Sequence, residues 1–256
     1  MRSILFRPNP ERENSLNADL WETGMAGIVE EENGFRAFFE DTADLTPLFN
    51  GYQSLILEIR NEQSRDWTLI SREGWDPIFA GERFFIVPPW LDQETPPGRT
   101  RLVIDTGMAF GSGRHESTQL MIQALEACLK PGDSVLDVGC GSGILSAVAE
   151  VLGAGRLLAC DIDYESVKRS RLHTNAPAFA GSAAAVPDGF GDIVAVNISA
   201  AAIDSLAVEL RRVAKPGAIL LLAGFIEENP PHSFHPDQVL QMNDWQCWVC
   251  CVGSAA

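Results

Sequence analysis

Residues 135–143 combine the features of a nucleotide-binding turn. They read Val-Leu-Asp-Val-Gly-Cys-Gly-Ser-Gly, an apolar strand that runs into three closely spaced glycines. Glycine is needed where a strand turns sharply and a ligand must approach the backbone. Asp161 lies 18 residues beyond Gly143, at the end of the next apolar run, 157–160. A carboxylate in that place can accept both hydroxyls of a ribose, so we expect the chain to bind an adenosine-bearing cofactor.

The spacing of the glycines separates two kinds of cofactor. A dinucleotide site has its third glycine one place later, where it allows close packing of the helix. In a dinucleotide site the negative charge of Asp137 would also lie close to the negatively charged pyrophosphate and repel it. The same charge attracts a cofactor that carries an ammonium and a sulfonium. Gly-x-Gly-x-Gly directly after a strand that contains this aspartate resembles the S-adenosylmethionine site of class I methyltransferases. S-adenosylmethionine is therefore the expected cofactor, and a nicotinamide dehydrogenase is the less favoured alternative.

Strand–helix alternation from residue 100 onward predicts the scaffold that positions this turn. Apolar runs predict strands at 102–104, 135–138, 157–160, 179–182, 193–196, 218–223 and 246–252. Ser117 is expected to cap a helix that stops at 131–132, and Asp163 is expected to cap a helix that runs to residue 175. Two further helices are expected over residues 144–152 and 201–214. A turn is expected at 215–217. The pattern is typical of an α/β fold, a doubly wound, mostly parallel seven-stranded Rossmann-like sheet with helices on both faces.

The first sixty residues follow a different order. Strands are predicted at 3–6, 28–31, 35–39 and 55–59, with helices at 13–21 and 44–49 and a tight turn at Asn33-Gly34. The resulting β-α-β-β-α-β order is that of a small ferredoxin-like α+β domain. We therefore divide the chain into a small ferredoxin-like domain (1–60), a connector (61–97) and a cofactor-binding domain (98–256). The connector is rich in tryptophan and includes a predicted strand at 83–87, so we expect it to pack rather than to act as a free tether.

Composition narrows the class of protein and partner. The chain has 256 residues, 46% of them hydrophobic, and a formal net charge of −16. An acidic surface repels phosphate backbones, so direct binding of nucleic acid is not expected, whereas a basic protein would be attracted. No apolar run approaches the roughly 18 residues of a membrane span, and residues 1–7 lack the pattern of a signal peptide. A cytoplasmic location is the expectation.

The cysteines are expected to be structural. Six cysteines fit no disulfide framework in a cytosolic chain of this length. Cys247 and Cys250 form a Cys-x-x-Cys pair, which can bind zinc, but no second Cys or His pair lies at a matching distance. The surrounding residues resemble a terminal strand, so no metal site is predicted.

Two further segments strengthen the resemblance to known methyltransferases. Residues 109–118 read Ala-Phe-Gly-Ser-Gly-Arg-His-Glu-Ser-Thr, and residues 196–200 read Val-Asn-Ile-Ser-Ala. With the glycine-rich turn, they resemble the ribosomal protein L11 methyltransferase family, whose patterns are Ala-Phe-Gly-Thr-Gly-x-His-x-Thr-Thr, Asp-x-Gly-Cys-Gly-Ser-Gly-Ile-Leu and Asn-Ile-Leu-Ala. The resemblance extends from about residue 66 to the end of the chain. It implies a methyltransferase with a small ferredoxin-like substrate-recognition domain in front.

The resemblance also implies a set of site residues. The predicted cofactor-binding residues are Phe110, Gly111, Thr118, Asp137, Gly139, Gly141, Asp161, Ile162 and Asn197. Thr118, near a helix start, is expected to bond the amino-acid end of the cofactor with help from free backbone N–H groups. Asn197, at the tip of its strand, is expected to face the methyl group and is the predicted catalytic residue. His115 is expected to position the cofactor loop rather than to act as a base.

Departures from the family pattern leave the acceptor open. Ser199 replaces leucine, residues 114–117 replace x-His-Pro-Thr, and residues 105–107 replace Asp-Pro-Gly. The expected reaction is transfer of a methyl group to a neutral amine, aligned by the Asn197 side chain and the Ile198 carbonyl without a strong general base. The acceptor is expected to be ribosomal protein L11 or another small basic protein. A small-molecule acceptor and a cofactor-binding protein without turnover are the alternatives.

Overall fold

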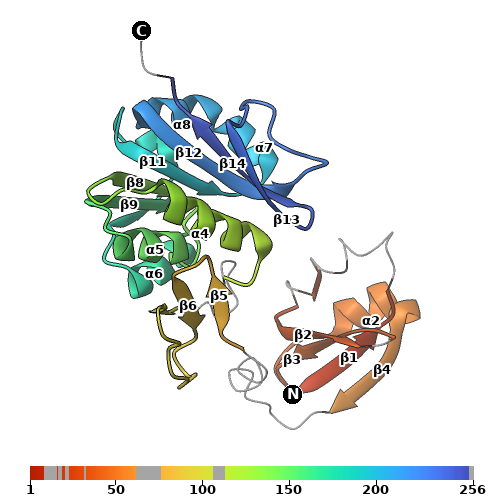
Figure 1. Cartoon of the computed structure of the whole chain (residues 1–256). Coiled ribbons are helices and arrows are strands. Elements are labelled where there is room, and N and C mark those ends of the chain that lie inside the picture. The colour runs from red at the N-terminus through yellow and green to blue at the C-terminus, as the bar shows by residue number, and fades with distance from the viewer. Residues whose placement is uncertain are drawn as a thin grey trace. The chain divides into compact units, whose positions relative to one another are not determined.

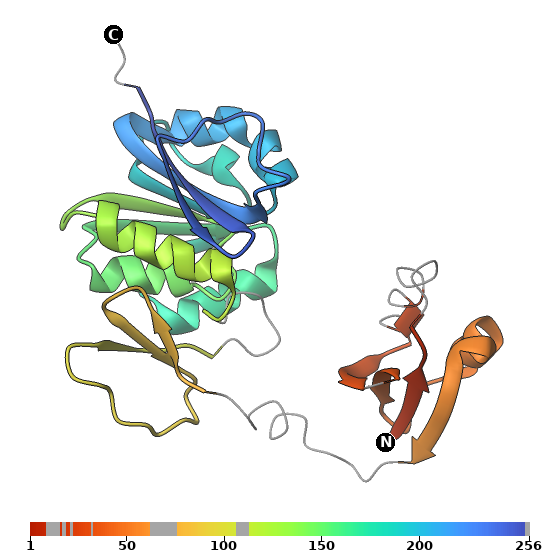
Figure 2. The same ribbon diagram turned by 45° about the vertical axis from the view of Figure 1, so that its right-hand side comes forward.

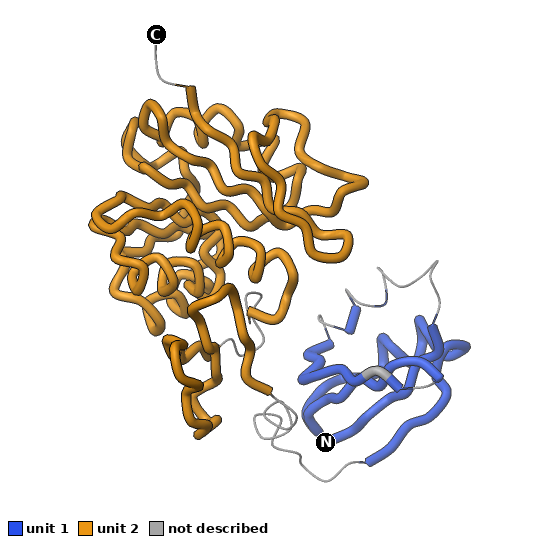
Figure 3. The backbone as a smooth tube through the Cα atoms, in the orientation of Figure 1, with its two compact units in different colours: residues 1–74 blue, residues 75–256 orange. Residues whose placement is uncertain are grey.

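The computed structural model describes residues 1–8, 16, 19–20, 23–31, 33–61, 76–105 and 113–253. The chain divides into two compact units, Met1–Gly74 and Trp75–Ala256 (Figure 3). The boundary between the units falls within the predicted connector 61–97. Each unit has its own hydrophobic core, described in turn below.

The first unit contains a four-stranded antiparallel sheet in the order β2-β3-β1-β4. Its elements are β1 (Arg2–Phe6), β2 (Met25–Glu31), β3 (Gly34–Phe39), α2 (Thr46–Tyr52), the 3₁₀ turn η1 (Gln53–Leu55) and β4 (Ile56–Asn61). The four predicted strands and the second predicted helix are therefore present. Of the helix predicted at 13–21, only Leu16, Asp19 and Leu20 lie within the described residues, and all three are helical.

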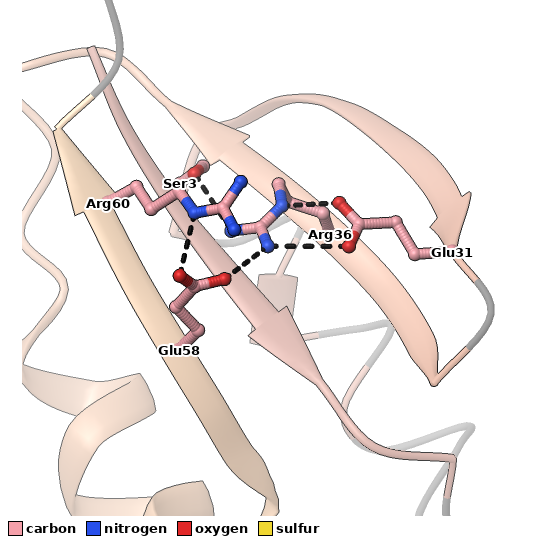
Figure 4. Close-up of polar contacts among 5 residues, drawn as sticks. All are labelled: Ser3, Glu31, Arg36, Glu58 and Arg60. Atoms are coloured by element: carbon pink, nitrogen blue, oxygen red, sulfur yellow. Dashed lines mark hydrogen bonds and ion pairs between the residues drawn. The ribbon is translucent and has the colours of Figure 1, made fainter.

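The two faces of this sheet differ in chemistry. Inward-facing Ile4 and Phe6 of β1 pack with the other members of an apolar core. On the opposite face, Arg36 is only 2% exposed. Its guanidinium donates two hydrogen bonds to the Glu31 carboxylate and one, of 2.7 Å, to the Glu58 carboxylate (Figure 4). The Glu58 carboxylate also accepts a hydrogen bond from Arg60. The two carboxylates satisfy the buried cation and thereby hold β2, β3 and β4 in register.

The second unit begins with a small three-stranded sheet. Its strands are β5 (Ile78–Ala80), β6 (Phe84–Val87) and β7 (Thr100–Val103), with β5 antiparallel and β7 parallel to β6. The predicted strand at 83–87 is confirmed, whereas β5 has no counterpart among the predictions. Apolar side chains of the three strands join the core formed by helices of the cofactor-binding domain. The described part of the connector from residue 76 onward therefore packs, as expected.

The main sheet of the second unit has seven strands and is mixed (Figure 1). In sheet order the strands are β10 (Ala178–Ala180), β9 (Arg156–Asp161), β8 (Ser134–Val138), β11 (Gly191–Asn197), β12 (Ala214–Ile226), β14 (Trp245–Cys251) and β13 (Gln238–Met242). The first five are parallel, and the last two form an antiparallel hairpin at one edge. The carboxyl ends of the parallel strands therefore meet at one edge, where ligands bind in open α/β sheets.

Alternation along the strands divides the side chains between two cores. Val135 and Ile193 face the core that contains α4 (Glu116–Cys128) and α5 (Ile144–Val151). Their neighbours Leu136 and Val194 face the core that contains α7 (Ala200–Ser205) and α8 (Ala207–Val213). α6 (Tyr164–His173) lies beside α5 and completes the first layer (Figures 1 and 2). Its buried Val167 packs with Ala159 of β9 and Ala178 of β10. Helices thus cover both faces, as the doubly wound prediction requires.

Helix starts show where local chemistry differs from the sequence prediction. Asp163 caps α6 by accepting from the backbone N–H groups of residues 165 and 166, as predicted. The cap of α4 is His115 rather than Ser117, because the His115 Nδ1 accepts from the Ser117 N–H. The expected cap was wrong by two residues: an imidazole ring takes the place usually occupied by a hydroxyl or carboxylate oxygen.

The segment after Asn197 also differs from expectation. The helix predicted over 201–214 is two helices that meet at Leu206, where the Ser205 hydroxyl donates to the Ala202 carbonyl at 2.8 Å. Serine that bonds back to the preceding turn competes with regular helix hydrogen bonds. The turn predicted at 215–217 lies inside β12, at a register shift opposite Gly191. The edge strand β13 was not predicted.

The Cys-x-x-Cys pair lies in β14, as the strand prediction required. The Cys247 side chain packs in the α4–α5 core and the Cys250 side chain packs in the α7–α8 core, so the two thiols point to opposite faces of the sheet. This arrangement prevents the pair from binding a common metal ion. Within the described ranges, no helix is long and apolar enough to span a bilayer.

Candidate functional site

The turn between β8 and α5 depends on glycine at each of its three positions. Gly139, Gly141 and Gly143 all have positive φ, which side chains disfavour. A Cβ on Gly143 would lie 2.7 Å from the Ser170 Cα, so this glycine lets the start of α5 pack against α6. A Cβ on Gly139 would lie 2.4 Å from the Ile198 Cγ2. The turn therefore keeps its shape through backbone geometry and close packing.

Asp161 holds this turn from the next strand. Its Oδ2 accepts from the Gly141 N–H at 2.9 Å, and its Oδ1 accepts from the Asp163 N–H at 2.9 Å. Each carboxylate oxygen has a second lone pair, so the side chain can still accept from a ligand. The end of β9 thereby places an anchored carboxylate beside the glycine-rich turn.

Asp137 lies beneath the turn and is 1% exposed. Its Oδ2 accepts from the Ser146 N–H at 3.1 Å and from the Ser146 hydroxyl at 2.7 Å. Its Oδ1 is buried and finds no hydrogen-bond partner in the part of the chain that the structure describes. Burial raises the pKa of this carboxyl to about 6, which the two bonds from Ser146 only partly offset. Asp137 fixes the first turn of α5 from below.

Asn197 and Thr118 meet across the sheet edge. The Asn197 Nδ2 donates to the Thr118 Oγ1 at 3.4 Å, although the two residues are 79 positions apart. The Asn197 Oδ1 is buried and has no hydrogen-bond partner within the described residues. A buried acceptor without a donor is costly, so this oxygen favours a ligand with an N–H or O–H group. The start of α4 and the tip of β11 therefore meet at this edge of the sheet.

These side chains surround a cavity of about 490 Å³ at the carboxyl edge of the sheet. Its described lining combines apolar side chains with a few polar groups. The lining residues are Thr118, Val138, Gly139, Cys140, Gly141, Ile144, Leu145, Asp161, Ile162, Ser166, Gly181, Ser182, Asn197, Ile198, Ala202, Ser205 and Leu206. Ile162 is 88% exposed, which leaves an apolar surface free for a flat ring. A carboxylate next to such a surface fits a nucleoside.

The structure places the predicted site residues in three groups. Six of them line the cavity, namely Thr118, Gly139, Gly141, Asp161, Ile162 and Asn197. Asp137 is not in the lining and lies beneath it. Phe110 and Gly111 fall outside the described residues. The expectation of free backbone N–H groups beside Thr118 was wrong for residues 117 and 118. The Thr118 N–H donates to the His115 carbonyl at 3.0 Å, and the Ser117 N–H donates to the His115 imidazole.

Several lining residues had no signal in the sequence. Ser166 belongs to the first turn of α6. Ser182 lies two residues beyond β10, which ends at residue 180 rather than at 182 as predicted. Ala202, Ser205 and Leu206 come from α7 and the residue after it. The end of β10 was the one available signal, because the strand predicted around 179–182 had to reach the same sheet edge. The α7 residues have ordinary types, and only the tertiary fold brings them to the cavity.

Comparison with known proteins gives one consistent result. A sequence model of the family described as ribosomal protein L11 methyltransferase (PrmA) matches residues 8–253. Ribosomal protein L11 methyltransferase of Burkholderia cenocepacia strain HI2424 is 35% identical over 204 residues, which cover 77% of this chain and 67% of the relative. That of Burkholderia mallei strain NCTC 10229 is 34% identical over 205 residues, covering 77% and 68%. The solved ribosomal protein L11 methylase of Lactobacillus delbrueckii subsp. bulgaricus superposes with a TM-score of 0.61 at 25% identity, covering 70% of this chain and 98% of that one.

Proposed function

The chain belongs to the ribosomal protein L11 methyltransferase family, and we propose that it methylates amino groups of ribosomal protein L11. It is an S-adenosylmethionine-dependent methyltransferase. One observation supports the site assignment most: Thr118, Gly139, Asp161 and Asn197 come from four separate segments and line one cavity.

The cavity residues fit the cofactor of this family. Asp161 is the carboxylate that would accept the ribose hydroxyls, and Ile162 offers apolar surface to the adenine. Gly139 lines the cavity, so the methionine part can lie against its backbone, while Ile198 fills the space that a side chain on this residue would need. The unpartnered Oδ1 of Asn197 matches a ligand that brings a donor to this end of the cavity. S-adenosylmethionine supplies a methyl group on a positively charged sulfur when it is bound.

The acceptor end works by alignment. An ammonium has no lone pair, and a free lysine has a pKa of about 10.4, so the site must favour the neutral amine. Apolar lining such as Leu206 removes water and favours that neutral form. The Asn197 Oδ1 and the Ile198 carbonyl would then accept the remaining amine hydrogens and aim the lone pair.

The other titratable groups of the described lining are not suited to act as a general base. Burial raises the pKa of the Cys140 thiol, which therefore stays protonated. Asp161 is already engaged by two backbone N–H groups at the far end of the cavity. Proton loss to solvent before the amine enters the cavity is consistent with this lining.

The first unit is proposed to recognise the protein substrate. Its sheet order β2-β3-β1-β4 is consistent with the ferredoxin-like domain predicted for residues 1–60. The net charge of −16 attracts a basic protein such as a ribosomal one. Because ribosomal proteins act in the cytoplasm, we place the enzyme there as well.

The test uses purified L11 and cofactor with a labelled methyl group. We expect label on lysine or amino-terminal nitrogens of L11, located by mass spectrometry. Asn197→Ala should lower kcat by roughly a hundredfold, because a misaligned nucleophile reacts slowly, while the Kd for S-adenosylhomocysteine changes little.

Ser199→Ala is the matched control in the same loop. Its hydroxyl caps α7 by accepting from the Ala202 N–H at 3.4 Å and is not assigned to the acceptor amine, so turnover should be retained. The enzyme and labelled cofactor are also incubated with a cell extract that contains small molecules. If small molecules become labelled and L11 does not, the proposed acceptor is contradicted. Full turnover by Asn197→Ala would remove the role of that side chain.

A further inference from the structure

Gly224 in β12 lies against the backbone of the acceptor loop. Its φ is +97°, and a Cβ on this residue would lie 2.3 Å from the Ile198 carbonyl oxygen, 2.7 Å from its carbonyl carbon and 2.9 Å from its nitrogen. All three atoms belong to the main chain, so they cannot swing aside as the end of a side chain can. Only glycine fits at residue 224 without moving the loop.

Other contacts bring Ile198 to this place. Asn197 is in register with Ala223, and the Ile198 N–H donates to the Ala223 carbonyl at 3.1 Å. The next residue, Ser199, is the N-cap of α7. The loop is therefore tied to β12 on one side and to α7 on the other, so its position depends on the β12 residue that it touches.

The Ile198 side chain is confined from the opposite direction. Its Cγ2 occupies the space that a Cβ on Gly139 would need, at 2.4 Å. Ile198 is thus held between a glycine of the cofactor turn and a glycine of β12. The turn between β8 and α5 therefore limits how far Ile198 can shift away from residue 224, so a small displacement of the loop is the expected response to a side chain there.

We propose that Gly224 is a positioning residue for methyl transfer, which sets the depth of the Asn197–Ile198 peptide in the cavity. The inference rests on the proposed function, in which these two residues aim the acceptor amine. Gly224 itself is not in the described lining of the cavity. It acts through the loop, so it should affect turnover more than cofactor binding.

The test compares Gly224→Ala with Gly217→Ala. Both glycines lie in β12 and have positive φ, at +97° and +79°, but a Cβ on Gly217 would meet no atom within 4 Å. The pair therefore separates backbone strain from contact with the loop. We measure kcat, the KM for S-adenosylmethionine, the Kd for S-adenosylhomocysteine by calorimetry, and the melting temperature.

We expect Gly224→Ala to lower kcat at least about tenfold, since misplacement of a reacting group by an ångström can slow a reaction by about a hundredfold. Its Kd for S-adenosylhomocysteine should stay within about threefold of the wild type, and Gly217→Ala should keep the wild-type kcat. If Gly224→Ala does not fold, the double variant Ile198→Ala/Gly224→Ala is compared with Ile198→Ala alone. The shortened side chain at residue 198 leaves room for the loop to shift, so the double variant is expected to fold.

Two results would overturn the inference. One is an unchanged kcat for Gly224→Ala, or for the double variant relative to its parent. The other is a parallel loss of kcat and of S-adenosylhomocysteine affinity, which would indicate a general collapse of the cavity. The wild type and Asn197→Ala are run alongside. Failure of the wild type to methylate L11 would contradict the proposed function itself, and full turnover by Asn197→Ala would remove the proposed role of that side chain. Slow Asn197→Ala with normal Gly224→Ala contradicts only the role of Gly224.

Discussion

The two ends of the cavity are built in different ways. At the cofactor end, the Asp161 carboxylate bonds the Gly141 N–H, a partner only 20 positions away. At the acceptor end, Asn197 bonds Thr118 from 79 positions away, and Ile198 packs against Gly224 of another strand. The part of the site that would hold the ribose is thus assembled from one strand–helix–strand unit, whereas the acceptor end needs several segments of the domain to come together.

This difference predicts a separation of effects. Changes at the cofactor end should alter cofactor affinity, because the Asp161 carboxylate there is anchored by backbone N–H groups of its own strand–helix–strand unit. Changes at the acceptor end should alter turnover with little effect on affinity. The following variants test each half of that statement.

The largest effect is expected for Asp161→Ala. The variant removes the carboxylate that would accept the ribose hydroxyls, and two charge-assisted hydrogen bonds contribute about 4 kcal/mol, or about a thousandfold in Kd. Calorimetry with S-adenosylhomocysteine measures the loss. Asp163→Ala removes the same charge two residues away and only weakens the cap of α6. Equal affinities for the two variants would contradict the assignment of Asp161.

The next effect concerns the pH dependence of stability and Asp137. Its pKa is raised to about 6 by burial, so the folded chain binds this proton more tightly than the unfolded chain. The stabilisation is present at low pH and is lost as the pH rises from about 4 to about 6. Asp137→Asn removes this dependence and keeps an oxygen that can accept from Ser146.

Urea denaturation without cofactor measures the consequence. The free energy of unfolding of Asp137→Asn relative to the wild type should increase by about 3 kcal/mol between about pH 4 and about pH 8. A difference that is the same at both pH values would show that the Asp137 carboxyl does not have a raised pKa. The result also tests whether the cofactor end is supported from beneath by a buried acid.

The smallest effect is expected for His173→Leu. The His173 Nε2 accepts from the Asp105 N–H at 2.9 Å, and its Nδ1 donates to the Ser142 carbonyl at 2.7 Å, so the ring ties the glycine-rich turn to the end of β7. Loss of both bonds should weaken S-adenosylhomocysteine binding by about 1 kcal/mol, several-fold in Kd, with kcat unchanged. His235→Leu, at an exposed histidine, is the control. A lower kcat with normal affinity would break the separation of the two ends.

The cofactor end could be predicted from sequence because its physics is local. Three glycines with positive φ, an apolar strand before them and an acidic residue at the next strand end all lie within 135–161. The strand and helix periods around them also gave the sheet and its two helical layers. Residues such as Gly139 and Asp161 were therefore identified without knowledge of distant segments.

The acceptor end could be predicted only in part, because tertiary contacts decide it. Asn197 was identified through resemblance to a family, but its hydrogen bond with Thr118 depends on where α4 packs, and the role of Gly224 depends on where β12 passes. The break between α7 and α8 at Leu206 was not predicted, because the sequence has no proline or glycine there. The strand β13 was not predicted because it is a short strand at the edge of the sheet, next to β14. The His115 cap was missed because imidazole is an uncommon capping group.

A crystal structure of the full chain with S-adenosylhomocysteine tests the central claim most directly. The account predicts ribose hydroxyls bonded to the Asp161 carboxylate and the cofactor sulfur directed toward Asn197 and Ile198. A nucleoside bound elsewhere, or bound in this cavity with its ribose out of reach of Asp161, would contradict it.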